Sequence, residues 1–412
     1  MGIAENRVIV VGGGASGMVA AISARRQGAD VTILERNPRV GKKILVTGNG
    51  RCNFTNINAD INCYQGSNPK FAYSALSKYG SKESIDFFEK LGIAHKVEEA
   101  GKVFPMSDQA SSILDVLLYE LNQMKVSIIC NAYVKNIKKK NAQFVVELED
   151  GSVIQGDRVI IATGGKAVPS TGSDGNGYEL AEKLGHTIIP IFPALVQLKL
   201  EGGCFKQIQG VKFMGTAELI HNNRPVAKDC GDILFANYGV SGPPILQISR
   251  KAGELLQENE EVFLKLNILD TFSRAELKNL MLERIKNGAK KSVEFSLVGL
   301  VNKRLIPVLL KEVGIKDLKY PVGNLASNDL EKIITILTDW RFKVRGTKSW
   351  PSAQVTAGGV DSREINPDTM ESKIIKGLYF TGEIIDIDGL CGGFNLQWAW
   401  SSGFIAGQNA AL

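Results

Sequence analysis

The stretch RVIVVGGGASG, residues 7–17, decides the fold. After Arg7 come four β-branched apolar residues, which are typical of a strand buried on both faces. Gly12, Gly14 and Gly17 follow in the spacing Gly-x-Gly-x-x-Gly. In this spacing the first glycine permits the turn, the second lets a phosphate approach the backbone, and the third lets the helix pack on the strand. The stretch therefore predicts a strand, a phosphate-binding turn and a helix.

The residues that follow complete a βαβ unit. The pattern predicts a helix over residues 15–27, and the N–H groups of its first turn, near Ala15 and Ser16, are free to bind phosphate. A second buried strand is predicted over residues 31–34. Glu35 closes that strand and is placed to accept hydrogen bonds from ribose hydroxyls. The unit therefore predicts a bound dinucleotide.

Three later segments favour FAD over NAD. Residues 40–53 form a long glycine-punctuated loop with three cations, which suits a pyrophosphate and the isoalloxazine. Residues 162–165 end a buried strand in a Gly-Gly turn. Residues 377–397 contain a strand, an acidic turn and the start of the last helix, whose dipole stabilises the anionic edge of reduced flavin by about 0.3–2 kcal/mol. Because FAD is a long ligand with two ends to anchor, an opening and a closing motif predict FAD.

The residues expected to bind FAD lie on these segments. NAD(P)H is expected only as a transient reductant, because residues 172–177 have the wrong spacing for a second dinucleotide turn. The expected FAD-binding residues are Gly12, Gly14, Ala15, Ser16, Gly17, Glu35, Arg36, Lys42, Lys43, Thr47, Gly48, Gly50, Arg51, Cys52, Asn53, Ala162, Thr163, Gly164, Gly165, Gly382, Glu383, Asp388, Gly393, Phe394, Asn395, Leu396 and Gln397.

The chain after the first βαβ unit changes character several times. Residues 71–125 are predicted to be mostly helical. The segments 127–130, 134–137 and 144–148 alternate like a small antiparallel meander, and residues 158–162 return to a buried strand.

A domain boundary is predicted where two prolines fall within residues 190–193. Beyond it, short alternating segments predict β-structure, and Ser273 with Glu276 forms a capping box at the start of a helical stretch. The predicted domains are an FAD-binding domain over 1–193 and 350–412, a β-rich insert over 194–270 and 336–349, and a helical subdomain over 271–335.

Composition argues against several classes of protein. The net charge is +6, but Lys and Arg are dispersed along the sequence, so a small-molecule substrate is expected and nucleic acid is not. Six cysteines without a CxxC and three histidines without close spacing predict neither a disulfide scaffold nor a metal site. No apolar stretch approaches about 18 residues and no signal peptide is visible, so we expect a cytoplasmic protein without a membrane partner. The oligomeric state is not predicted.

Several motifs together closely resemble the BaiN/YhiN-like flavoproteins, also called the aminoacetone-oxidase family. The resemblance covers essentially the whole chain. It implies an α/β fold with a discontinuous FAD-binding Rossmann-like domain of the glutathione-reductase type, interrupted by a β-barrel-like unit and a helical unit. It is carried by residues 41–56, 101–105, 356–360 and 381–403.

The resemblance implies an oxidoreductase with one of two reactions. In the first, the flavin takes a hydride from a small amine such as aminoacetone and passes electrons to oxygen. In the second, flavin reduced by NAD(P)H delivers a hydride to the C=C bond of an enone in a steroid-like acid, which requires a proton donor. Tyr238 is the candidate donor, and no other catalytic residue is predicted. Ala236 and Asn237 stand where the family often has Thr-His, so this chain lacks that histidine.

Two alternatives from other classes stay open. Other two-domain flavoproteins act on tRNA, so an FAD-dependent tRNA-modifying or RNA-binding protein is the first. The second is a flavin-binding module without catalysis, which would hold FAD that no donor reduces.

Overall fold

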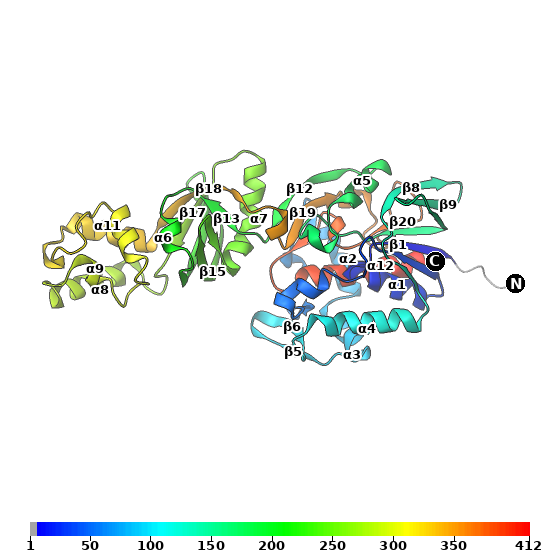
Figure 1. Ribbon diagram of the computed structural model, residues 1–412, viewed down its shortest axis with the longest axis horizontal. Coiled ribbons are helices and arrows are strands. Elements are labelled where there is room, and N and C mark those ends of the chain that lie inside the picture. The colour runs from blue at the N-terminus through cyan, green and yellow to red at the C-terminus, as the bar shows by residue number, and fades with distance from the viewer. Residues whose placement is uncertain (1–5) are drawn as a thin grey trace. The chain divides into compact units, whose positions relative to one another are not determined.

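The glycine-rich turn follows the central strand of a parallel sheet in the computed structural model, which describes residues 6–412 (Figure 1). The chain divides into two units. The chain up to Phe192 joins Ala353–Leu412 in the first unit, and Pro193–Ser352 form the second. The first unit is therefore discontinuous in sequence, and the second is one continuous insertion.

The parallel sheet has the strand order β20-β11-β1-β2-β7. All of its strand pairs are parallel. Residues 8–11 of the central strand are at most 3% exposed, as expected for a strand buried on both faces. The predicted α/β fold of the Rossmann type is confirmed. The strands are β1 (Arg7–Val11), β2 (Asp30–Leu34), β7 (Ser127–Ile129), β11 (Arg158–Ile161) and β20 (Leu378–Phe380).

Helices and small sheets complete the first unit. The helices are α1 (Ala15–Arg26), α2 (Ala72–Lys78), α3 (Ser81–Lys90), α4 (Ala110–Gln123), α5 (Asn176–Lys183) and α12 (Phe394–Ala410). The small sheets are β3 (Thr55–Asn56), β6 (Lys102–Pro105) and β5 (His95–Val97); β8 (Val134–Lys140), β9 (Gln143–Leu148) and β10 (Val153–Gly156); β4 (Tyr64–Gln65) with β21 (Asp388–Gly389); and β12 (Ile188–Ala194) with β19 (Val355–Val360).

One expectation for this unit is wrong. The segment 127–130 belongs to the parallel sheet as β7, with Ser127 opposite Thr32, and the meander consists of β8, β9 and β10. A strand that follows a crossover helix, here α4, returns to the parallel sheet. Residues 71–125 are mostly helical, as predicted, with α2, α3 and α4, and the short strands β5 and β6 lie between α3 and α4.

The first and last helices of this unit touch through their backbones. A Cβ atom on Gly403 of α12 would lie 2.5 Å from the carbonyl oxygen of Ser16 in α1. A Cβ atom on Gly407 would lie 2.2 Å from the carbonyl oxygen of Ala20. Only glycine permits this approach. The contact therefore ties the end of the chain to the helix that begins at the glycine-rich turn.

A closed antiparallel barrel is the centre of the second unit, and a group of helices is inserted between its strands β17 and β18 (Figure 1). The strand order around the barrel is β13-β16-β15-β14-β17-β18. The strands are β13 (Leu198–Leu200), β14 (Lys212–His221), β15 (Arg224–Ala236), β16 (Gly239–Ser241), β17 (Phe263–Asn267) and β18 (Trp340–Thr347). The helices are α6 (Phe205–Ile208), α7 (Pro243–Gln257), α8 (Arg274–Asn287), α9 (Val293–Ser296), α10 (Ile306–Glu312) and α11 (Ser327–Thr338).

The start of α8 is the predicted capping box. The Ser273 hydroxyl accepts the Glu276 N–H at 3.3 Å, and the Glu276 carboxylate accepts the Ser273 N–H at 2.8 Å. This prediction is confirmed. At the other end of the helical group, α11 continues to Thr338. The chain therefore returns to β-structure at Trp340, and not at residue 336 as predicted.

The contact between α1 and α12 predicts that Gly407→Ala destabilises the first unit. The added methyl group would meet backbone, and overpacking of this kind outweighs the roughly 1 kcal/mol that alanine gains over glycine in a helix. We expect a net loss of about 2 kcal/mol in urea unfolding followed by circular dichroism. Gln408→Ala, on the neighbouring half-buried position, is the control and should leave the midpoint unchanged. Equal midpoints for the two variants would contradict the contact.

A buried histidine predicts how the first unit responds to acid. His186 is 4% exposed; its Nδ1 lies 3.2 Å from Glu364 Oε2 and its Nε2 lies 2.9 Å from Ser372 Oγ. Burial lowers the pKa of His186 below its usual 6.5, although Glu364 opposes the shift. The unfolded chain therefore takes up the proton at higher pH than the folded chain, and stability is lost as the pH falls from about 6.5 toward the lowered value.

We expect His186→Gln to be less stable at pH 8, because hydrogen bonds are lost, but to lose less further stability on acidification to pH 5.5 than the parent protein. The urea unfolding midpoints of the variant and the parent protein at pH 8 and at pH 5.5 measure this difference. His95→Gln, at a surface position beside Glu89, is the control and should follow the parent. A His186 variant that loses as much stability as the parent on acidification would contradict the role of this ring.

Candidate dinucleotide-binding site

The three spaced glycines have different steric surroundings. Gly12 has φ +108°, and a Cβ there would lie 2.4 Å from the carbonyl oxygen of Ala162. A Cβ on Gly17 would lie 2.0 Å from the carbonyl oxygen of Gly12, so this glycine lets α1 begin directly against the turn. A Cβ on Gly14 would meet no atom within 4 Å. The open space is therefore at Gly14, the position at which a phosphate approaches such a turn.

The first turn of α1 presents unpaired backbone donors at this open space. Gly14 is the N-cap and no side chain caps the helix. The first hydrogen bond that returns to the turn is from Met18 N to Gly14 O, at 3.0 Å. The N–H groups of Ala15, Ser16 and Gly17 therefore have no acceptor within the described residues, which is the arrangement that binds anions at a helix N-terminus.

Glu35 lies beside the turn, after the carboxyl end of β2. Its side chain is 8% exposed, and its Oε2 accepts the N–H of Gly13 at 3.0 Å. Its Oε1 accepts both the backbone and side-chain N–H groups of Asn37, each at 2.8 Å. The carboxylate is thus fixed in orientation, and its remaining lone pairs can accept hydroxyl groups. Gly13 was not among the residues expected at the site, although its N–H holds Glu35. A side chain at this position would collide with Val40, because a Cβ atom there would lie 2.4 Å from it.

Two expected cations near β2 are engaged with a neighbouring loop. The guanidinium of Arg36 pairs with Asp174 and lies 4.9 Å from the centre of the Tyr133 ring. Lys42 donates to Asn37 Oδ1 at 3.2 Å and to the carbonyl oxygen of Ser170 at 3.0 Å. These contacts join the end of β2 to the loop before α5.

The loop over residues 40–53 is tightly turned. Gly48, Asn49, Gly50 and Cys52 all have φ between +55° and +83°. The Thr47 hydroxyl donates to the Ile44 carbonyl oxygen at 2.7 Å. The Cys52 side chain is fully buried, and burial raises the pKa of its thiol to about 12. Cys52 is therefore a neutral thiol near pH 7 and not a nucleophilic thiolate.

Arg51 is not brought to the dinucleotide site with the rest of its loop. Its guanidinium pairs with Glu98 and Asp108 and lies 4.0 Å from the centre of the Phe104 ring. Arg51 and Lys96 lower the pKa of both carboxyl groups through hydrogen bonds. All the guanidinium nitrogens of Arg51 have protein partners, so nothing in this arrangement directs the side chain toward a cofactor.

The segments after β11 and β20 meet the same region. Lys43 Nζ lies 2.5 Å from Glu383 Oε2, and the Thr356 N–H donates to Glu383 Oε1 at 2.8 Å. A Cβ on Gly165 would lie 2.3 Å from the Thr356 hydroxyl. The Thr163 hydroxyl is buried without a hydrogen-bond partner in the described residues. An orphaned hydroxyl of this kind calls for a ligand or water.

Four further residues that were expected to bind FAD lie in or beside the strands of these segments. Ala162 is buried and pairs with β1, Gly164 has φ +71°, and Asp388 is buried in β21. Gly382 has φ +79°, and a Cβ there would lie 2.6 Å from the Ser16 hydroxyl. Ser402 of α12 accepts the Gly382 N–H at 2.9 Å, a role for which the sequence carries no local signal.

The N-terminus of α12 resembles that of α1. Gly393 is its N-cap, with φ +98° and no side-chain cap, and a Cβ there would lie 2.9 Å from Asn53 Oδ1. The N–H groups of Phe394, Asn395 and Leu396 have no acceptor within the described residues, since the first returning bond is Gln397 N to Gly393 O. The Gln397 side chain is instead buried among Thr55, Tyr79 and Ser401, where its amide is fully used.

The structure therefore brings four expected segments of the first unit together. The opening glycines contact Ala162 and Gly382, Lys43 contacts Glu383, and Asn53 approaches Gly393. These segments follow the carboxyl ends of the parallel strands, where α/β proteins bind their ligands. Arg51 is engaged by Glu98 and Asp108, and Tyr238 belongs to the second unit, in the turn between β15 and β16.

Residues 6–412 contain no cluster of His, Cys, Asp and Glu side chains that could hold a metal ion. No helix in that range has both the length and the apolar character that crossing a membrane requires.

Known proteins are similar over nearly the whole chain. Residues 6–409 match the model of the HI0933-like protein Rossmann domain. A 3-dehydro-bile acid delta(4,6)-reductase of Clostridium scindens is 40% identical over 98% of this chain and 99% of its own length. A ribosomal RNA dihydrouridine synthase of Escherichia coli is 33% identical over 97% of both chains, and a protein of the same name from Haemophilus influenzae is 31% identical over 96% of both. The resemblance to the BaiN/YhiN-like flavoproteins is thereby confirmed, and the chain belongs to the HI0933-like family of Rossmann-fold proteins.

Proposed function

We propose that this protein is an FAD-dependent reductase that adds two hydrogens across a C=C bond conjugated to a carbonyl group. The observation that carries the proposal is the 40% identity, over the full length, with a reductase named for the delta(4,6) bonds of a 3-dehydro bile acid. The relatives named for dihydrouridine support the same reaction class, because the double bond of uracil is also conjugated to a carbonyl. This evidence favours reduction of an enone over oxidation of a small amine such as aminoacetone.

The residues of the first unit fit FAD. The free N–H groups of α1 and the open space at Gly14 suit the pyrophosphate, and Glu35 suits the ribose hydroxyls. The unpaired N–H groups of α12 suit the flavin edge that becomes anionic on reduction. The buried Thr163 hydroxyl has no hydrogen-bond partner among the described residues. The same segments that the sequence indicates therefore hold the cofactor in this proposal, except for the side chains of Arg51 and Gln397.

The reaction divides between cofactor and protein. Bound FAD, once reduced by NAD(P)H, supplies the hydride that adds to the carbon β to the carbonyl. The protein holds the substrate, and a protein group or water supplies the proton for the α carbon. Tyr238 stays the candidate donor: burial raises the pKa of its hydroxyl, so it keeps its proton near neutral pH. Lys348 Nζ lies 4.7 Å from the centre of its ring.

A second candidate substrate is uridine in RNA. Its support is the pair of relatives named as ribosomal RNA dihydrouridine synthases, at 33% and 31% identity. The chemistry at the flavin is the same as for an enone, so the two candidates differ in what the protein recognises around the double bond. Turnover of each substrate class with the same FAD-loaded protein separates them.

A pair of glycine variants tests the FAD site. Gly14→Ala should fold normally, because no protein atom lies within 4 Å of the added methyl group, but it should weaken FAD binding about ten- to a hundred-fold by displacing a phosphate from its N–H donors. Titration of the apoprotein with FAD measures this. Gly203→Ala, at another open position, is the matched control and should bind FAD like the parent. If Gly14→Ala also bound FAD like the parent, the phosphate site would lie elsewhere.

The reaction is tested in two anaerobic steps. NADH or NADPH should bleach the visible band of the bound flavin, and a 3-oxo steroid acid with a conjugated double bond should restore it and gain two hydrogens by mass. Saturated 3-oxo steroid acid is the control and should leave the flavin reduced. If aminoacetone bleached the oxidised flavin and the enone failed to reoxidise the reduced flavin, the proposal would be contradicted.

A further inference from the structure

The first residues of β14 extend past the end of the neighbouring strand β17. β14 pairs with β15 from Lys212 onward, but it pairs with β17 only from Thr216 onward. Apart from β15, no segment of residues 6–412 has a backbone hydrogen bond with residues 212–214. One side of β14 is therefore an open strand edge over these residues, which we call the β14 edge.

The β14 edge presents backbone donors and acceptors to its open side. The N–H and C=O groups of successive residues in an antiparallel strand point alternately to its two sides. Val211 O accepts the N–H of Phe235 at 3.0 Å, so the odd-numbered residues of this stretch face β15. Thr216, an even-numbered residue, pairs with β17 on the other side. The N–H and C=O groups of Lys212 and Met214 therefore point to the open side, where a further strand can pair with them.

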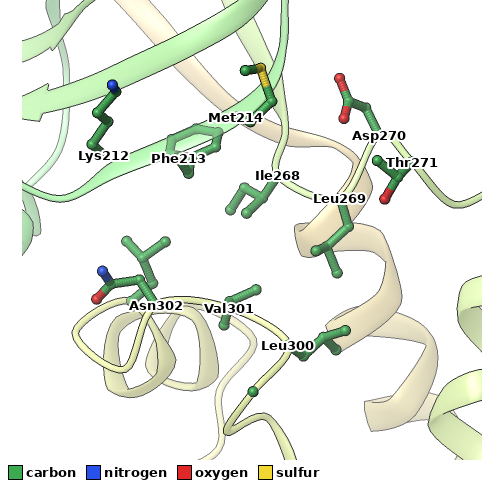
Figure 2. A pocket seen from close by; sticks show the side chains of 12 residues that line it. Lys212, Phe213, Met214, Ile268, Leu269, Asp270, Thr271, Leu300, Val301 and Asn302 are labelled. Atoms are coloured by element: carbon green, nitrogen blue, oxygen red, sulfur yellow. The ribbon is translucent and has the colours of Figure 1, made fainter.

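A cavity of about 440 Å³ lies beside the β14 edge, within the range of about 300–1,000 Å³ that is typical of ligand sites. Figure 2 shows Phe213 and Met214 on the side opposite Leu300 and Val301. A chain that pairs with the edge can therefore place an apolar side chain in the cavity. The apolar wall that faces the edge consists of Ile268, Leu269, Leu300, Val301 and Leu305.

The two ends of the cavity carry opposite charges. Figure 2 shows Lys212 and Asn302 on one side and Asp270 on the other. Asp270 Oδ2 accepts the Thr216 hydroxyl at 2.7 Å, and its Oδ1 has no donor among residues 6–412. At the other end, the Lys212 ammonium pairs with Asp232 at 2.8 Å, which leaves the rest of its three donors available. A cation therefore fits the Asp270 end, and a carboxylate fits the Lys212 end.

We propose that the β14 edge and its cavity bind an extended peptide segment of a partner protein, which adds a strand to β14. β14 is antiparallel to both β15 and β17, and an added strand of the same kind runs from the Asp270 end toward the Lys212 end. Alternate residues of a strand point to one face, so the charges select a basic first residue, an apolar third residue and an acidic fifth residue. Five extended residues span about 17 Å. This proposal does not depend on the reductase activity.

The test is the binding of a fluorescently labelled peptide with blocked termini, Lys-Thr-Leu-Thr-Glu, to the FAD-loaded protein, measured by fluorescence anisotropy. The reversed peptide, Glu-Thr-Leu-Thr-Lys, has the same composition and should bind about five-fold more weakly, because both of its charges meet like charges. Bound Lys-Thr-Leu-Thr-Glu should also slow the hydrogen exchange of the Lys212 and Met214 N–H groups, since the added strand accepts them.

Two pairs of variants separate the backbone edge from the charge. Met214→Pro removes an N–H that does not bond to β15 and should weaken binding about ten-fold, whereas Met214→Ala keeps this N–H and should retain most of the affinity. Asp270→Asn can still accept the Thr216 hydroxyl but loses the charge, so the preference between the two peptides should shrink. Glu283→Gln, at an exposed position of α8, is the matched control and should keep the preference of the parent.

Four results would overturn the proposal. The first is no binding of either peptide at about 1 mM, and the second is tighter binding of the reversed peptide. The third is an affinity of Met214→Pro equal to that of the parent, with circular dichroism showing that the variant is folded; if it does not fold, an unchanged preference in Asp270→Asn decides against the site. The fourth is a dimer that Met214→Pro dissociates, since a second copy of the chain would then cover the edge.

Discussion

The backbone contact between α1 and α12 is the constraint on which the first unit depends. Gly403 and Gly407 let α12 approach the carbonyl oxygens of Ser16 and Ala20, so the end of the chain is held against its beginning. Each of these helices begins with N–H groups that have no acceptor among residues 6–412. Each start therefore attracts negative charge, as a pyrophosphate has, and as a flavin acquires on reduction. The chain can make a long excursion between the two helices because this contact, together with the pairing of β20 with β11 and of β19 with β12, brings the halves of the fold back together.

Fixed hydrogen bonds at the site hold the groups that a cofactor would meet. Glu35 is oriented by Gly13 and Asn37, and Glu383 is oriented by Lys43 and the Thr356 N–H. A group that is already oriented loses little entropy when a ligand arrives, so more of the interaction energy appears as affinity. Each carboxylate also keeps lone pairs free of protein donors, because carboxylate oxygens accept more bonds than these partners supply.

Features that depend on local sequence could be predicted, and those that depend on distant partners could not. The strand before Gly12 and the capping box at Ser273 are set by neighbouring residues, and the structure contains both. The sheet partner of β7 and the ion pairs of Arg51 depend on residues far along the chain. A cation in a glycine-rich loop therefore looked like a cofactor ligand, although Glu98 and Asp108 engage it. Ser402 was missed for the same reason, since its partner Gly382 is brought to it only by the fold.

The pairing of β12 with β19 has a consequence for how this family can change. β12 carries the chain out of the first unit and β19 carries it back, and the two strands are hydrogen-bonded neighbours. The ends of the inserted segment are therefore held close together in space, which is the condition under which a whole module can be replaced without disturbing its host. Substitutions, insertions and deletions in the second unit can then accumulate while the sheet that carries the glycine-rich turn stays unchanged.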